Sequence, residues 1–149
     1  MEYILKDREG GCFLCDAVHG SDDRGNLVLR RCEHGMLLMN RYPYNNGHLM
    51  IAPYRHVDSL EAMNEQELLE MMRMAATACA TLRKAISADG FNVGLNLGAS
   101  AGAGLKDHVH LHVVPRWEGD TNFMPVISDA KVIPQSLDDL WVDLSNALG

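Results

Sequence analysis

Three histidines alternate with apolar residues over positions 108–114, which read His-Val-His-Leu-His-Val-Val. Successive side chains of a β-strand point to opposite faces, so this period predicts a strand with His108, His110 and His112 on one face. Neighbours on one face stand about 6.6 Å apart, which lets one phosphate group or one metal ion contact more than one ring. Neutral imidazole binds metals and also acts as a nucleophile or as an acid or base. The segment therefore indicates either metal binding or phosphorus chemistry.

A loop of very small residues, 98–104, precedes the histidines and includes Gly98, Gly102 and Gly104. Such a loop can turn its backbone N–H groups toward an anion and allow the anion to approach closely. Lys106 and Arg116 flank the same predicted strand and supply the positive charge that phosphate recognition uses. Together these residues predict a phosphate site.

The pair Cys12-x-x-Cys15 has a spacing that suits either metal binding or redox chemistry. A tetrahedral zinc site needs two further ligands, and His56 and His108 are the candidates, because histidine is the usual supplement. A redox dithiol is the alternative. It is less favoured because the pair does not open a helix after a strand in a recognisable βαβ pattern.

The hydrophobic pattern predicts an α+β domain with a largely antiparallel sheet and one long helix across it. The long helix starts at a capping box formed by Asn64 and Glu67 and continues to Ile86. Its apolar face is predicted to comprise Leu68, Met71, Met72, Ala75, Cys79, Leu82 and Ile86. A short terminal helix is predicted from Ser136 to Leu148. Strands are predicted at 26–30, 35–39, 48–52, 91–97 and 108–114.

The 149 residues predict one domain, residues 1–149, and the formal charge of −7 argues against broad nucleic-acid binding, which relies on a basic surface. No apolar run approaches the roughly 20 residues that span a bilayer, and the start of the chain does not resemble a signal peptide. We therefore expect a cytoplasmic protein without membrane contact. Cys32 and Cys79 have no partner spacing and are expected to be small buried apolar residues.

The triad followed by Pro115-Arg116 resembles the signature of the histidine triad (HIT) nucleotide hydrolases and transferases. The resemblance extends over nearly the whole chain, because segments 40–56 and 91–98 are similar to the family's upstream strands. Segment 102–123 is most similar to the bacterial diadenosine tetraphosphate phosphorylase and hydrolase branch. The resemblance implies a HIT-like fold, a homodimer formed through the long helix and the adjoining strand, and adenine nucleotides or dinucleoside polyphosphates as substrates.

The same resemblance implies a two-step displacement at an α-phosphorus. His110 would form a nucleotidyl-histidine intermediate, which water or inorganic phosphate then resolves. His112 would contact the α-phosphate and the leaving oxygen, and His48 would support the triad. Asn40 matches a position on the nucleoside side, and Asn96 lies at a strand end near the proposed site.

In zinc-bearing relatives, including the galactose-1-phosphate uridylyltransferase branch, a Cys-x-x-Cys pair and two histidines hold the ion. The resemblance carries this role to Cys12, Cys15, His56 and His108, with the zinc ion structural and not a Lewis acid in the reaction.

Two positions depart from the family pattern. Gly104 stands where many members have Gln or Ser, and Leu97 stands where a polar side chain is common. Part of the phosphate recognition would then come from Ser100, Lys106 or the backbone. Two other functions stay open: a zinc hydrolase that uses all three triad histidines as ligands, and a non-catalytic nucleotide-binding module.

Overall fold

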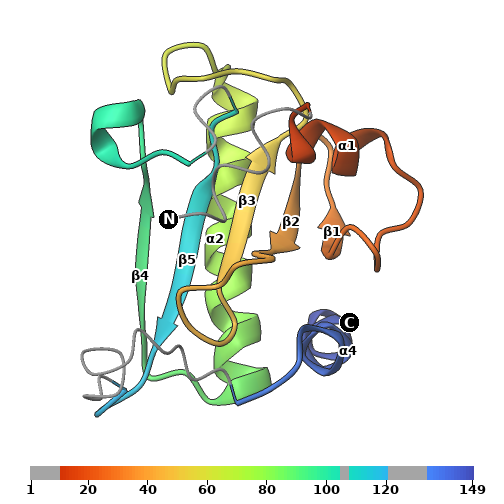
Figure 1. Ribbon diagram of the computed structural model, residues 1–149, viewed down its shortest axis with the longest axis vertical. Helices are drawn as coiled ribbons and strands as arrows, with labels where there is room; N and C mark the ends of the chain where they lie inside the picture. The colour runs from red at the N-terminus through yellow and green to blue at the C-terminus, as the bar shows by residue number, and fades with distance from the viewer. Residues whose placement is uncertain (1–10, 105–107, 121–133) are drawn as a thin grey trace.

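The computed structural model describes residues 11–104, 108–120 and 134–149, which form one antiparallel sheet with a long helix across it (Figure 1). The strands are β1 (Val28–Arg31), β2 (Gly35–Met39), β3 (Leu49–Pro53), β4 (Gly90–Leu95) and β5 (Leu111–Arg116), in the order β1-β2-β3-β5-β4. The helices are α1 (Phe13–His19), α2 (Glu65–Ile86) and α4 (Leu137–Leu148), and a 3₁₀ turn, η2, spans Ala99–Ala101. The predicted α+β class, the five strands and both predicted helices are confirmed.

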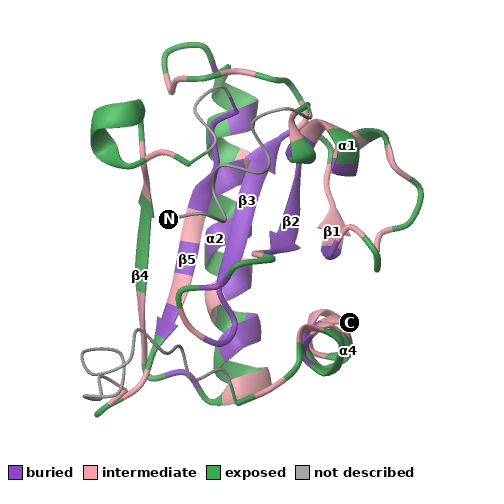
Figure 2. Ribbon diagram, viewed as in Figure 1, coloured by how far each residue is buried: buried purple, intermediate pink, exposed green. Residues whose placement is uncertain are grey.

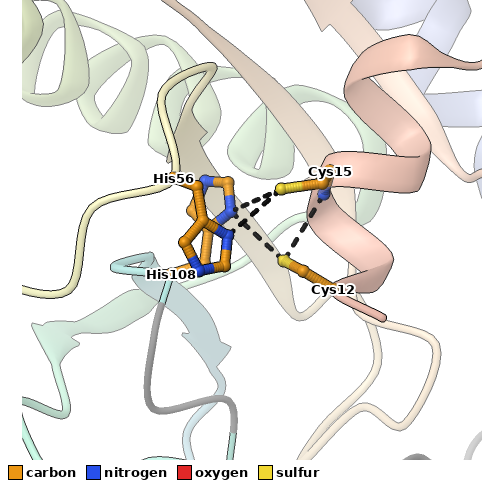
Figure 3. A group of neighbouring side chains, drawn as sticks. All are labelled: Cys12, Cys15, His56 and His108. Carbon is orange, nitrogen blue, oxygen red and sulfur yellow. Dashed lines mark hydrogen bonds between the residues drawn. The ribbon is translucent and has the colours of Figure 1, made fainter. Parts of the chain in front are cut away.

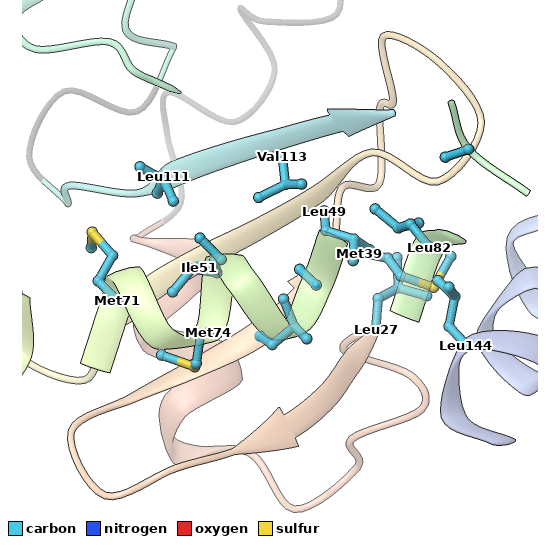
Figure 4. Packing of buried hydrophobic residues seen from close by; sticks show 14 of the residues in the cluster. Leu27, Met39, Leu49, Ile51, Met71, Met74, Leu82, Leu111, Val113 and Leu144 are labelled. Carbon is cyan, nitrogen blue, oxygen red and sulfur yellow. The ribbon is translucent and has the colours of Figure 1, made fainter. Parts of the chain in front are cut away.

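Helix α2 begins at the predicted capping box. The Asn64 side chain accepts from the N–H of Glu67, and the Glu67 side chain accepts from the N–H of Asn64. The buried stripe of α2 packs against the sheet (Figure 4) and consists of Met71, Met74, Ala75, Ala78, Thr81 and Leu82, apart from Glu67 in the first turn. Leu68 and Met72 were wrongly placed on this stripe, because they lie at its flank and are 36% and 59% exposed.

The two faces of the sheet have separate cores, because alternate strand residues point opposite ways. Leu37 of β2 and Ile51 of β3 belong to the core beneath α2. Their neighbours Leu38 and Met50 belong to a second core, which α1 covers with Leu14 and other residues. Figure 2 shows that β2 and β3 are buried and that β5 alternates between buried and half-buried residues, whereas β4 is partly exposed along its length. Helix α1 was not expected from the sequence.

Strand β5 starts at Leu111, so the prediction of a strand from His108 was wrong at its start. The pairing of β5 with both neighbours begins at this residue, opposite Ile51 of β3 and Leu95 of β4. The apolar partners of the histidines, Val109, Leu111 and Val113, are buried as expected. The predicted period therefore holds, although His108 and His110 precede the hydrogen-bonded ladder.

Helix α4 is capped by Ser136, whose side chain accepts from the N–H of Asp139, and it buries Leu140 and Leu144. Cys32 and Cys79 are half-buried and pack against the core beneath α2, in line with their predicted apolar role. Within the described segments, even α2, the longest helix with 22 residues, lacks the apolar length needed to cross a bilayer.

Candidate active site

His110 and His112 lie together on the face of the sheet opposite α2. His112 pairs with Met50, and directly opposed residues of an antiparallel pair share a face. The rings of His110 and His112 have centroids 4.8 Å apart and meet edge to face. Helix α1 packs on the part of this face formed by β1 to β3, whereas His112 lies on the neighbouring strand β5, next to the area that α1 covers.

The hydrogen bonds of His110 fix its tautomer. Nδ1 lies 2.9 Å from the carbonyl oxygen of His108, which can only accept, so Nδ1 carries the proton. Nε2 of the neutral ring is then the unprotonated nitrogen. Because burial lowers the pKa of His110 below its ordinary value of 6.5, the ring is neutral at pH 7 and Nε2 has a lone pair available for nucleophilic attack.

A second chain of hydrogen bonds fixes His112. The N–H of Tyr44 donates to Nδ1 of His48 at 3.0 Å, so the proton of a neutral His48 is on Nε2. This Nε2 lies 2.8 Å from Nδ1 of His112 and donates to it. The proton of His112 is therefore on its own Nε2, which becomes a donor beside the nucleophile.

The turn that carries His48 requires glycine at position 47. Gly47 has φ of +81°, and a Cβ there would stand 2.6 Å from Cδ1 of Ile86 in α2. A side chain at this position would meet both backbone strain and a packed helix end. His48 is only 1% exposed, so its position is set by this packing and by the N–H of Tyr44. Sequence analysis did not identify Tyr44, because its contribution is a backbone group.

A second cluster brings together Cys12, Cys15, His56 and His108 (Figure 3). Sγ of Cys12 lies 3.3 Å from Nδ1 of His108, and Sγ of Cys15 lies 3.2 Å from Nδ1 of His56. All four ligand atoms lie within 4.8 Å of one another. Bonds of about 2.3 Å to sulfur and about 2.0 Å to nitrogen in a tetrahedral zinc site separate the ligands by about 3.3–3.8 Å. The cluster could therefore hold a metal ion, and the donor set fits zinc.

The tautomer of His108 also suits metal binding. Its Nε2 lies 2.8 Å from the carbonyl oxygen of Pro53 and donates to it, which leaves the lone pair of Nδ1 facing both sulfur atoms. A ligand histidine held by a backbone carbonyl on its other nitrogen is the usual arrangement in metal sites. Among the residues that the structure describes, this cluster takes only His108 from the triad, which does not support a zinc hydrolase with three triad ligands.

The Cys12–Cys15 pair opens helix α1, with Cys12 as the N-cap residue, and no strand precedes this helix among the described residues. The βαβ pattern of a redox dithiol is therefore not seen there, and a redox dithiol is not favoured. Burial raises the pKa of Cys12 to about 11, whereas reactive thiols at helix N-termini have lowered pKa values. A bound cation would replace that proton, because metals bind the thiolate.

The predicted nucleotide residues are dispersed around the histidines. The Asn40 side-chain nitrogen lies 3.4 Å from Nδ1 of His48. Asn96 is half-buried and directly follows β4, whose last residue pairs with Leu111 beside His110. Ser100, Gly102 and Gly104 are exposed in the loop between β4 and β5, and Lys106 lies outside the described residues. Phosphate binding by this loop stays a prediction.

Arg116 ends β5, so it flanks this strand as predicted, but it does not lie beside the histidines. It lies at the opposite end of β5, about 20 Å from His110 at roughly 3.3 Å per strand residue. Its guanidinium forms a bidentate ion pair with Asp120, with contacts of 2.6 and 2.8 Å, and also donates to Asn92. It is excluded from the candidate site.

Comparison with known proteins identifies the family. The HIT domain profile matches residues 25–119, which include the triad and its supporting strands. The chain belongs to the HIT family. A protein of Methanocaldococcus jannaschii known as an uncharacterized HIT-like protein is 30% identical over 109 residues, or 73% of this chain and 81% of the relative.

A Mycobacterium tuberculosis protein named AP-4-A phosphorylase is 49% identical to this HIT chain over 119 residues, which cover 80% of this chain. The match spans only 60% of the relative's length. Among solved structures, a zinc-bound histidine triad protein from Mycobacterium smegmatis matches with a TM-score of 0.73 at 23% identity, and 93% of each chain is covered. This structural likeness confirms the HIT fold.

The low pKa of His112 predicts a pH-dependent stability. Burial, and secondarily the neighbouring His110, lower this pKa to about 4 from the ordinary 6.5. Between these values the unfolded chain binds an extra proton at this residue, so the free energy of unfolding falls as the pH is lowered from about 6.5 toward about 4. In urea unfolding between pH 6.5 and 5, His112→Gln should show a shallower fall, by up to about 1.4 kcal/mol per pH unit. Parallel profiles for the two proteins would contradict the low pKa.

Proposed function

We propose that this HIT protein cleaves an α-phosphate bond of an adenosine polyphosphate, such as diadenosine tetraphosphate, or of an AMP conjugate. The observation that carries the proposal is the pair of fixed tautomers, with unprotonated Nε2 on His110 and Nε2–H on His112 beside it. The M. tuberculosis relative named AP-4-A phosphorylase supports this choice of substrate class.

In the first step Nε2 of His110 attacks the α-phosphorus. An N–P bond forms, and the bond to the bridging oxygen breaks, so that the leaving nucleotide takes the electron pair. Nε2–H of His112 donates a hydrogen bond to the oxygen on which charge develops. The N–H groups of Ala101, Gly102 and Ala103 already donate within the loop 98–104, so further donors for the non-bridging oxygens would come from the other N–H groups of this loop. The positive charge that His110 gains on attack is stabilised by its Nδ1–H bond to the carbonyl oxygen of His108.

In the second step an oxygen of inorganic phosphate or water attacks the same phosphorus, and the N–P bond breaks. Nε2 of His110 regains its lone pair. Phosphate as the acceptor yields ADP from an adenylyl intermediate, whereas water yields AMP. Diadenosine tetraphosphate therefore gives ADP and ATP by phosphorolysis, and AMP and ATP by hydrolysis.

The metal site is proposed to hold a structural zinc ion through Cys12, Cys15, His56 and His108. A bound ion would supply a cross-link between α1 and the segment that precedes the catalytic histidines. Its nearest link to the reaction is the carbonyl oxygen of His108, which accepts from His110. The zinc-bound HIT protein from M. smegmatis supports the choice of metal.

The reaction is tested with diadenosine tetraphosphate in the presence and absence of inorganic phosphate, with nucleotides separated by ion-exchange chromatography. His110→Ala should lose turnover by at least about 10³-fold, because the nucleophile is removed. After a quench in alkaline detergent, which preserves the acid-labile N–P bond, His112→Asn should retain covalently bound radiolabelled nucleotide, whereas His110→Ala should retain none. Binding of the nucleotide without any turnover or covalent labelling would favour the non-catalytic alternative.

Removal of zinc is expected to act on activity through structure. Incubation with a strong chelator should lower the unfolding temperature first, and the activity should decline in step with the loss of folded protein followed by circular dichroism. A structural ion predicts this order, because it stabilises the fold and takes no part in the transfer. Immediate loss of activity in a protein with an unchanged spectrum would refute the structural assignment.

We also propose a homodimer formed through β4 and the adjacent flank of α2. The guanidinium of Arg83 in α2 lies 4.9 Å from the ring centroid of Phe91 in β4, so this flank of the helix adjoins the strand. Helical spacing places Met72, which is 59% exposed, on the same flank, and alternation along β4 places Val93, which is 45% exposed, on the same face of the strand as Phe91. Strand β4 forms one edge of the sheet, which a second copy could extend.

If this dimer forms, light scattering at micromolar concentration should give twice the 16.5 kDa mass of the single chain. Met72→Lys should shift the mass toward the monomer, because a charge would be buried at the interface. Gln66→Lys is the matched control, since Gln66 is exposed and helical spacing places it about 120° around α2 from Met72, so the mass should stay unchanged. A monomeric wild type, or equal effects of both substitutions, would refute this interface.

A further inference from the structure

The four candidate metal ligands come from three separate parts of the chain, and two of these parts are fastened by an arginine outside the ligand set. Cys12 and Cys15 stand at the start of α1, whereas His56 lies in the connection between β3 and α2. His108 is fastened independently by its bond to Pro53 and by the N–H of Val109, which donates to the carbonyl of Val57.

Arg31 holds the far end of α1. Its Nη2 donates to the carbonyl oxygens of Ala17 and Gly20 at 2.6 and 3.2 Å, and its Nη1 donates to that of Val18 at 3.1 Å. Asp23 accepts from Nε and Nη2 at 2.9 and 2.8 Å and fixes the guanidinium. These carbonyls end a helix of 7 residues, which would be marginal alone. Arg31 thereby ties the helix that carries both cysteines to β1.

Arg55 holds the segment that carries His56. Its Nε and Nη2 each donate to one carboxylate oxygen of Glu67 at 2.6 Å, and Nη2 also donates to the carbonyl of Ala62 at 2.9 Å. Glu67 is only 5% exposed and belongs to the capping box of α2. The residue directly before His56 is therefore anchored to the rigid first turn of the long helix.

We propose that Arg31 and Arg55 are positioning residues that preorganise the metal site, with Arg31 placing Cys12 and Cys15 and Arg55 placing His56. This inference rests on the proposed zinc site. A planar guanidinium with several donors in a fixed fork suits this task, and lysine, as a single flexible point charge, does not. Because both arginines hold backbone segments, the loss of either side chain should weaken zinc binding without removing a metal ligand.

The test measures zinc affinity by competition with a chromogenic chelator. Arg31→Lys and Arg55→Lys should each raise the zinc dissociation constant by about 10- to 100-fold, the usual effect of losing a residue that orients metal ligands. Arg30→Lys is the matched control, because Arg30 is the neighbour of Arg31 on β1 but donates to the carbonyl of Leu148 in α4. The zinc dissociation constant of Arg30→Lys should stay within about twofold of that of the wild type, well below the effect of losing a residue that orients metal ligands.

Cobalt substitution separates positioning from ligation. At saturating cobalt, Arg31→Lys and Arg55→Lys should recover the thiolate-to-cobalt absorption of the wild type, whereas Cys12→Ala should not. Circular dichroism of the metal-free variants shows whether the fold survives. If a lysine variant is unfolded, Asp23→Asn, which weakens the support of Arg31, and Glu67→Gln, which weakens that of Arg55, serve in its place.

The outcomes are distinct. Wild-type protein that binds no zinc would refute the proposed metal site itself. A second set of results would refute this inference alone. In it, the wild type binds zinc, and either the folded Arg31→Lys and Arg55→Lys variants have unchanged zinc affinity or Arg30→Lys loses as much affinity as they do.

Discussion

The hydrogen bond from Nδ1 of His110 to the carbonyl oxygen of His108 joins the two chemical centres of this HIT protein. It fixes the protonation of the candidate nucleophile on one side. On the other side, its acceptor belongs to the residue whose imidazole faces Cys12 and Cys15. Because a carbonyl can only accept, this bond sets the tautomer of His110 whatever the rest of the site does. The position of the acceptor, in turn, depends on everything that holds the His108 backbone and ring.

The sheet supports that position from two directions. Val109, Leu111 and Val113 enter the core beneath α2, so the backbone of this segment is fixed by apolar burial. The ring of His108 is held by the carbonyl of Pro53, at the end of the neighbouring strand β3. The same alternation therefore gives one segment two functions, with apolar side chains on one face for stability and imidazoles on the other face for chemistry.

Much of this arrangement could be predicted from the sequence because it depends on periodicity and local chemistry. The Asn64–Glu67 capping box marked the start of α2, and the alternation at 108–114 separated core residues from histidines. The start of β5 could not be predicted, since it depends on where β3 and β4 end their pairing. Arg116 was predicted correctly at the end of the strand, but its ion pair was not, because Asp120 comes close only through the turn that follows β5. The contributions of Tyr44 and Pro53 are backbone groups, which no residue type reveals.

Burial solves a problem that two adjacent imidazoles would otherwise create. If His110 and His112 were both protonated, two positive charges would stand with ring centroids 4.8 Å apart, and the nucleophile would have lost its lone pair. Burial lowers the pKa of each ring, so both are neutral at pH 7. A neutral ring can still serve as either donor or acceptor, and the carbonyl of His108 and the imidazole of His48 decide which nitrogen does which. Two identical side chains thus supply a nucleophile and a hydrogen-bond donor. They differ only in the partner of Nδ1, which is a carbonyl oxygen for His110 and a donating imidazole for His112.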